Sequence, residues 1–303
     1  MDLEIIDNIS TNGTFDPSTS YHLNRNHHVD TLITIFGLGS VIASILIIFI
    51  FRRYQVLHTR TNAYVTNLCV SNILYLLFSP LFLNLFGIAE IVQAEEICIV
   101  DESLMLLLLS LFVFATVLLL DWYIITYKSY NVSVRCKSSY TLIIATIWLI
   151  FISFFITICL QCASGISVFP IITIIGAFFY LYFFIFVFLI HIARLFKFAN
   201  PNAIQGELEL ELEIGTLFCM CWMPNCAMYV SYVFGLRYSL DLELFTYCIA
   251  HTYPIILFTL LYYKDGNFRI CCRNLFKNER LETESEEIGT DRSGGKQRFT
   301  LFI

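Results

Sequence analysis

The chain has 303 residues, of which 58% are hydrophobic and 14% are charged, and it carries a formal net charge of −6. Soluble domains average about 25% charged residues. This composition excludes a soluble globular protein, because the chain has too few polar residues to cover a surface that faces water. We expect lipid to cover most of it.

Seven apolar stretches are long enough to cross a bilayer, which takes about 20 residues of helix. In chain order they lie near residues 31–52, 63–88, 98–126, 140–160, 168–193, 211–235 and 242–263. Only the short segment 161–165 separates the fourth from the fifth. If these two formed one span, the count would be six and the C-terminus would change sides. The sequence predicts an all-α membrane protein, a seven-transmembrane helix bundle over residues 31–263.

The basic residues fall unevenly on the two sides of this bundle. With seven spans, only Arg25 and Arg237 of the 18 Lys and Arg residues lie on one side. Cytoplasmic connections carry the excess of Lys and Arg. This asymmetry predicts an extracellular N-terminus and a cytoplasmic C-terminus for the multi-pass protein, which we expect in the plasma membrane.

Polar segments flank the predicted bundle. Residues 1–30 are predicted to form an extracellular tail that is glycosylated at Asn8 and Asn12, which begin sequons. Sequons also arise by chance, as at Asn131 on the predicted inner side. Residues 264–278 are predicted to form a short amphipathic helix on the membrane surface, and residues 279–303 a disordered cytoplasmic tail. Phosphorylation would add negative charge to this tail and could bind an arrestin-type partner. A disordered tail without such a role explains its composition equally.

Several segments, taken in order, resemble motifs of the rhodopsin-like G protein-coupled receptors, most closely the chemokine receptors. Residues 221–224 read Cys-Trp-Met-Pro, an intact match to the family's Cys-Trp-x-Pro in the sixth helix. Looser matches are 67–72 in the second helix, Asp121, Trp122 and Tyr123 in the third, Trp148 in the fourth, and Tyr253 and Pro254 in the seventh. The resemblance covers residues 31–278 and assigns switching roles to the motif residues, Trp222 among them.

Three prolines fall inside predicted spans, at the positions that the family uses. Pro80, Pro224 and Pro254 each remove a backbone hydrogen bond and kink a helix. Membrane helices tolerate proline in general, so the prolines alone do not identify a receptor. In the family, such kinks act as hinges around an outward-facing cavity.

The departures from the family pattern fall on its polar switch positions. Trp122 replaces the arginine of Asp-Arg-Tyr and cannot form a bidentate ion pair. Asn72 replaces the aspartate of the second helix, and the segment at Tyr253 lacks both the Asn and the Tyr of Asn-Pro-x-x-Tyr. This pattern resembles the chemokine-receptor homologues of large DNA viruses, particularly herpesviruses, and implies atypical or reduced coupling to G proteins.

The resemblance also implies one disulfide and an acidic ligand site. Cys98 and Cys162 stand where the family has its disulfide, with Cys159 as the rival partner. Chemokines are basic, so outer acids such as Asp101 and Glu102 would attract them. Glu243 lies eleven residues before Pro254, the spacing of an acid that many chemokine receptors use to hold a ligand's N-terminus; an ordinary helix-end acid explains it equally.

Other side chains have a structural interpretation beside a functional one. The acidic run 207–213 is either a solvated helix end or an altered G protein surface. Cys271 and Cys272 are palmitoylation candidates or plain buried thiols. His191 and His251 are interpreted as hydrogen-bonded core residues rather than metal ligands.

These observations favour a receptor that is surrounded by lipid and binds an extracellular chemokine or peptide. A heterotrimeric G protein or arrestin is the expected partner on its cytoplasmic side. A non-signalling decoy or trafficking glycoprotein is the first alternative, and a small transporter the second. We expect no enzymatic activity, no catalytic residue, no cofactor, no metal and no nucleic-acid partner. For a viral protein, the membrane would be that of the host cell.

Overall fold

The computed structural model describes residues 27–79, 94–127, 130–164, 169–196, 205–235 and 240–277. These residues form helices and contain no strand. The helices are α1 (His27–Arg53), the short 3-10 helix η2 (Gln55–Leu57), α2 (Arg60–Phe78), α4 (Ala94–Tyr127), α5 (Tyr130–Ala163), α6 (Phe169–Phe196), α7 (Gln205–Val233), α8 (Leu240–His251), α9 (Tyr253–Lys264) and α10 (Gly266–Lys277). The predicted all-α class is confirmed for this part of the chain.

Five segments are long and apolar enough to cross a membrane. They are Thr34–Arg53, Cys98–Thr126, Tyr140–Ala163, Ile174–Arg194 and Phe245–Lys264. Large apolar side chains point outward from them; Leu142 on α5 and Phe178 on α6 are 70% and 68% exposed. Because so many adjoining apolar side chains are stable only against lipid, the chain is a multi-pass membrane protein, as its composition predicts.

α2 and α7 are not among these five segments, so the count of seven spans stays a prediction. Polar residues lower the hydropathy of both helices: α2 contains Asn62, Asn67 and Asn72, and α7 begins with the acidic run. Asn62 and Asn72 are buried, because α2 packs against both α1 and α4. The second half of the predicted span 63–88 continues beyond the described residues.

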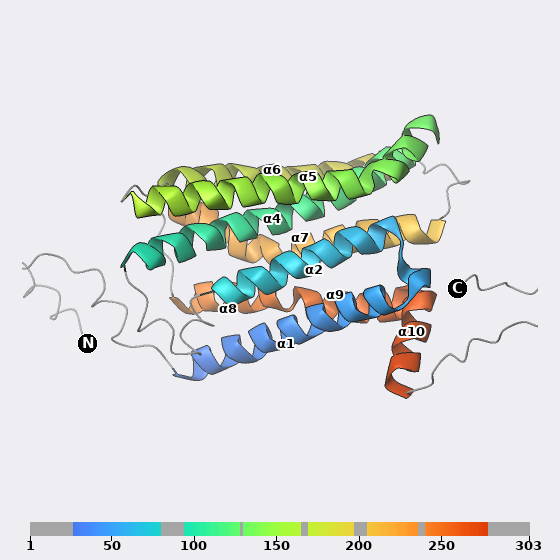
Figure 1. Ribbon diagram of the computed structural model, residues 1–303, viewed down its shortest axis with the longest axis horizontal. Helices are drawn as coiled ribbons and strands as arrows, with labels where there is room; N and C mark the ends of the chain where they lie inside the picture. Colours follow the sequence, from blue (N-terminus) through green and yellow to red (C-terminus); the bar gives the residue numbers. More distant parts are fainter. Residues whose placement is uncertain are drawn as a thin grey trace, which may run out of the picture.

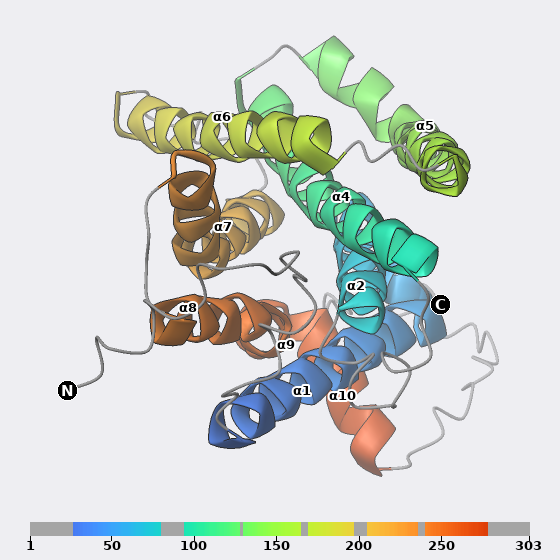
Figure 2. The same ribbon diagram turned by 90° about the vertical axis from the view of Figure 1, so that its left-hand side faces the viewer.

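The long helices lie side by side along the long direction of the molecule, and α10 lies across one end (Figure 1). α4 is central, because it packs against α2, α5, α6 and α7. Figure 2 shows this arrangement from the end of the bundle. Below, "the α10 end" means the end at which α10 lies, and "the disulfide end" means the opposite end, at which α4 begins.

Aromatic rings fill the middle of the bundle where α4, α6 and α7 meet. The ring centroid of Phe112 on α4 lies 4.6 Å from that of Tyr180 on α6 and 5.0 Å from that of Phe218 on α7. Phe218 in turn contacts Trp222, at 5.9 Å. Lipid tails are as apolar as these rings, so close packing of large side chains, rather than escape from water, holds the helices together.

A proline marks the break between α8 and α9. α8 ends at His251 and α9 begins at Tyr253, with Pro254 in its first turn. Pro254 has no N–H to donate to the preceding turn, and nearby the Thr252 hydroxyl donates to the carbonyl of Ile249, at 2.7 Å. The kink predicted at Pro254 is therefore present as a helix break, whereas Pro224 lies inside the continuous helix α7.

α10 is amphipathic and is capped by Asp265. The Asp265 carboxylate accepts hydrogen bonds from the backbone N–H groups of Asn267 and Phe268, at 2.9 and 3.2 Å, which stabilises the first turn. Phe268 is fully buried and meets the ring of Phe51 at a centroid distance of 5.6 Å. This apolar face joins α10 to the end of α1.

Candidate functional site

The disulfide end contains one covalent link between helices. Cys98 on α4 and Cys162 in the last turn of α5 form a disulfide, with their Cα atoms 6.0 Å apart. Cys159, the rival partner, is a free thiol. The pairing implied by the resemblance is therefore confirmed, and at the disulfide end it anchors α5, the least enclosed of the five spans, to the central helix.

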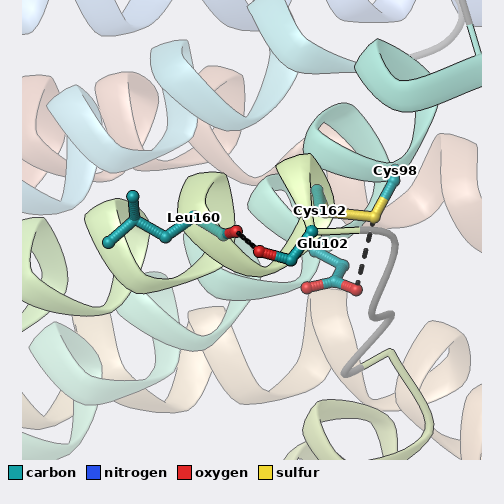
Figure 3. The surroundings of a disulfide bond; sticks show 5 residues. Cys98, Glu102, Leu160 and Cys162 are labelled. Atoms are coloured by element: carbon teal, nitrogen blue, oxygen red, sulfur yellow. Dashed lines mark hydrogen bonds between the residues drawn. A yellow bond between two sulfur atoms is a disulfide. The ribbon is translucent and has the colours of Figure 1, made fainter.

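Glu102 lies beside this disulfide, one turn farther along α4. Its Oε1 lies 3.7 Å from the Sγ of Cys98, and its side chain is buried, with 1% exposed (Figure 3). The neighbouring Asp101 is exposed. Cys98, Cys162 and Glu102 lie close enough to hold a metal ion, but the two sulfurs are bonded to each other, so neither offers a thiolate ligand.

Asp101 and Glu102 thus differ, although both are predicted from the sequence to belong to one acidic surface. Asp101 faces outward, where a basic ligand could reach it, whereas Glu102 faces the disulfide. Glu243 belongs to α8, and its side chain lies outside the described residues. Asn8 and Asn12 lie outside them as well.

An aromatic box surrounds His251 in the middle of the bundle. The His251 ring lies 4.0 Å from Tyr247, 6.0 Å from Tyr75 and 6.2 Å from Trp222, measured between ring centroids. Neither ring nitrogen of His251 has a hydrogen-bond partner in the described part of the chain, which corrects the interpretation of His251 as hydrogen-bonded. The same interpretation is confirmed for His191, whose Nε2 lies 3.0 Å from the Thr216 hydroxyl.

The second-helix motif forms a neutral polar contact with α1. The amide Nδ2 of Asn72 donates to the hydroxyls of Ser40 and Ser44, at 3.1 and 3.3 Å. All three residues are buried. These hydrogen bonds between neutral side chains join α2 to α1.

At the α10 end, four residues from three helices form a buried charge cluster, here called the Arg60 cluster: Arg60 and Thr61 on α2, Asp121 on α4 and Glu211 on α7. The Nε of Arg60 lies 2.6 Å from the Oδ2 of Asp121, and its Nη2 lies 3.6 Å from the Oε1 of Glu211. The Thr61 hydroxyl donates to the same Oε1. The side chains of Arg60, Asp121 and Glu211 are only 15%, 7% and 2% exposed.

The start of α2 places Arg60 in this position. The Thr59 side chain accepts a hydrogen bond from the N–H of Asn62, at 3.3 Å, and caps the helix. Asn62 also donates to the carbonyl of Leu57, at 2.9 Å, which holds η2 against α2. Arg60 is therefore the first residue of a fixed helix, and its guanidinium reaches across to α4 and α7.

Arg60 is not among the site residues predicted from the sequence, where it counts only as one of the basic residues that indicate orientation. The available signal is Asp121, an acid at the end of an apolar span whose motif neighbour is Trp122 instead of arginine. A buried carboxylate needs a cation or several hydrogen-bond donors, so a basic residue from another helix is required. Spacing in the sequence does not show which one.

The acidic run of α7 is neither uniformly solvated nor uniformly available to a partner. Glu211 is buried in the Arg60 cluster. Glu213 accepts from the Nζ of Lys264 at the end of α9, at 2.8 Å. Glu209 is exposed, and the side chain of Glu207 lies outside the described residues. At least two of the four carboxylates therefore connect α7 to other helices.

Trp122 is buried with 5% exposed, and Tyr123 is half-buried. Trp122 packs into the core, while Asp121 pairs with Arg60. Asp121 thus contributes a negative charge, which Arg60 of α2 neutralises. Trp122 contributes an apolar surface to the core.

Cys271 and Cys272 lie on the inward face of α10, with 5% and 3% exposed. Burial raises the pKa of the Cys271 thiol from 9.0 to about 11, and it raises the pKa of Cys272 as well. Both thiols are thus protonated and covered at neutral pH. Their palmitoylation stays a prediction.

No protein-family model matches the chain, and no curated protein sequence matches it significantly. The resemblance to receptors thus depends on the motif residues and on the contacts described above.

Proposed function

We propose that this chain is a seven-transmembrane receptor of the rhodopsin-like, chemokine-receptor type, which binds an extracellular chemokine or peptide. The observation that carries the proposal is the Cys98–Cys162 disulfide between α4 and α5, because the receptor motifs implied this pairing over the rival Cys159. The all-helical, multi-pass architecture is compatible with it. Trp222 of the Cys-Trp-Met-Pro segment, fully buried at the bundle centre, also supports it.

Coupling to G proteins is atypical or reduced in this proposal. Trp122 stands where the family has an arginine, and it is buried rather than available to a partner. Asp121 is occupied by Arg60. The altered positions at Asn72 and Tyr253 support the same conclusion, as does the viral, herpesvirus-type origin that the pattern of losses favours.

A binding screen tests the ligand part of the proposal. Labelled chemokines are added to cells that express the chain, and association and dissociation rates are measured at low and high salt. Attraction between a basic ligand and outer acids predicts that salt slows association far more than dissociation. Glu243→Gln should weaken binding, whereas Glu209→Gln, the same chemical change on α7 far from the proposed outer surface, should not.

Two outcomes would contradict this ligand site. The first is that no chemokine or basic peptide binds at any salt concentration. The second is that a ligand binds and Glu243→Gln and Glu209→Gln leave its affinity equally unchanged. Either result would show that the predicted outer acids do not attract a basic ligand.

Orientation has a separate test. In the proposed arrangement the N-terminus is extracellular and the C-terminus cytoplasmic, so Asn8 and Asn12 face the glycosylation machinery. Enzymatic deglycosylation should increase the gel mobility of the natural chain and not that of the Asn8→Gln/Asn12→Gln double variant. An unglycosylated natural chain that reaches the cell surface, with its N-terminus inaccessible to antibody on intact cells, would contradict this orientation.

A non-signalling decoy or trafficking glycoprotein is the alternative that the structure favours next, because the Arg60 cluster closes the α10 end with internal charge pairs. One assay distinguishes the decoy from the receptor. A decoy takes up bound ligand without any ligand-dependent change in G protein activity, whereas the receptor changes that activity.

A further inference from the structure

We propose that Arg60 is a conformational lock: its guanidinium holds α7 to α2 and α4 at the α10 end, and this end opens only when the contact between Arg60 and Glu211 breaks. The lock replaces a cation that the Asp121-Trp122-Tyr123 segment itself does not supply. It regulates the proposed receptor function and in that sense rests on it, although the contacts themselves require neither ligand nor G protein.

The position of the charges shows that they serve contacts between helices rather than the helices themselves. Arg60 is the first residue of α2, where the helix dipole disfavours a cation. Asp121 follows a long apolar run of α4, and this run offers its carboxylate no cation. Because Arg60 and Asp121 lie 2.6 Å apart, each compensates the other, and both lose this compensation if α2 and α4 separate.

The two halves of the lock differ in strength. Arg60 lies 2.6 Å from Asp121 but 3.6 Å from Glu211, so the contact with α4 is the tighter one. Glu211 has a further tie to α2 through the Thr61 hydroxyl. α2 and α4 therefore form the fixed side, and the first half of α7 is the element that can be released.

The chain offers a hinge for this release. Pro224 removes one backbone hydrogen bond within the continuous helix α7, and Glu211 and Glu213 both lie between this weakened point and the α10 end. The pair between Glu213 and Lys264 ties the same segment to α9. Its side chains are 33% and 55% exposed, so salt screens it, and it adds little to the buried cluster.

One guanidinium serves two carboxylates, which makes Arg60 the residue on which the cluster depends. Without Arg60, Asp121 and Glu211 would be two buried acids close together with no cation between them, an arrangement that favours separation of α4 from α7. Without the Glu211 charge, Arg60 still pairs with Asp121, and only the contact with α7 is lost. Both changes should open the same end, the first more than the second.

The test measures distances in the purified full-length chain in lipid nanodiscs, without ligand. Spin labels are placed on two exposed positions, Leu142→Cys on α5 and Glu209→Cys on α7, and their separation is read by pulsed electron resonance. Cys136 and the half-buried free thiols Cys159, Cys219 and Cys248 are replaced by serine in all variants, so that they do not take a label. The natural pairing predicts one dominant distance. Arg60→Gln should add a second population at another distance, and Glu211→Gln a smaller fraction of the same population.

Arg52→Gln is the matched control, because Arg52 is an exposed arginine at the same end, in the last turn of α1. It should leave the distribution of the natural chain unchanged. If Arg60→Gln does not fold, Glu211→Gln decides alone, because glutamine keeps the size of the side chain and accepts from Thr61. Distributions that remain identical in the natural chain, Arg60→Gln and Glu211→Gln would overturn the lock.

The lock and the receptor function can be contradicted independently, by different results. A second population in Arg60→Gln with no chemokine or peptide ligand found would support the lock and remove the proposed function. Ligand binding with unchanged distances would do the reverse.

Discussion

The indole Nε1 of Trp148 donates a hydrogen bond of 2.7 Å to the Oδ1 of Asn67, which ties α5 to α2. This contact adds to the packing of α5 on α4, because α5 is largely exposed: only 17% of its most apolar residues are buried, against 61% for α4. The ring of Trp148 also packs against Phe114 of α4, at a centroid distance of 5.5 Å. α5 is therefore held in its middle by this hydrogen bond and by ring packing, and in its last turn by the disulfide.

Trp148→Phe should lower the stability of the chain by about 1 kcal/mol, the usual net value of a hydrogen bond between membrane helices. Phenylalanine keeps part of the packing against Phe114 but leaves Asn67 without its donor. Thermal unfolding of the detergent-solubilised protein measures the change. Trp148→Phe and Asn67→Leu together should cost less than the sum of the single changes, and strict additivity would show that the hydrogen bond contributes nothing.

Gly215→Ala should destabilise the contact between α7 and α4. A Cβ at residue 215 would lie 2.6 Å from the Cγ of Leu119, and Leu119 is fully buried, so it has little room to move. Overpacking costs about 1–3 kcal/mol, more than the gain of up to about 1 kcal/mol from replacing glycine in a helix.

Gly176→Ala is the control for this change. A Cβ there would lie 3.6 Å from the Tyr180 hydroxyl, at ordinary contact distance, so the same substitution should be neutral or slightly stabilising. The two melting temperatures should move in opposite directions or by clearly different amounts. Equal shifts would mean that α4 and α7 are not as close at Gly215 as the structure has them.

Loss of the disulfide should reduce delivery of the chain to the cell surface. Removing a native disulfide typically costs about 2–5 kcal/mol, and here it also releases the last turn of α5 from α4. Cys98→Ser and Cys162→Ser should each be retained in the endoplasmic reticulum, while Cys159→Ser, which removes a free thiol, should not. Surface staining by flow cytometry measures this. Normal staining of both bridge variants would contradict a structural role for the bond.

Alkylation of Cys271 should be slow in the folded chain and should accelerate with pH. Thiolate is the reactive form, and a pKa raised from 9.0 to about 11 lowers its fraction roughly a hundredfold at pH 7.5 relative to the unfolded chain. Between pH 7.5 and 9.5, labelling followed by mass spectrometry should speed up about tenfold per pH unit. A pH-independent rate would show that access, not ionisation, limits the reaction.

The same shift has a consequence for stability, because the folded-state pKa lies above the unfolded one. Both states hold the thiol proton below pH 9, and only the unfolded state releases it between pH 9 and about 11. Stability should therefore fall as the pH rises through this window. Cys271→Ser should remove part of the fall.

Trp122→Arg should restore little G protein activation. Asp121 already pairs with Arg60, so a second arginine would enter a buried site where its expected partner is occupied. Asn72 and the missing tyrosine of the seventh helix also remain. We expect weak activation by the natural chain and a gain below about tenfold, or ~1.4 kcal/mol, in the variant. Strong ligand-dependent activation by the natural chain would contradict this reading of the α10 end.

Local patterns in the sequence determined the membrane character and the helices α1, α4, α5 and α6. In lipid, a helix satisfies its backbone hydrogen bonds within its own segment, so a long apolar run is sufficient to predict it. The acidic run shows the limit of such patterns. Residues two positions apart on a helix point in nearly opposite directions, so Glu211 is buried while Glu209 is exposed, although in the sequence they look alike.

Only the tertiary structure decided which charges meet. Arg60, Asp121 and Glu211 are far apart in the chain, and their pairing depends on how α2, α4 and α7 pack at the α10 end. Sequence spacing determines contacts one or two turns apart within a helix, but contacts between helices depend on their relative position and rotation. The sequence could therefore predict that Asp121 lacks its motif arginine, whereas the helix packing brings Arg60 to it.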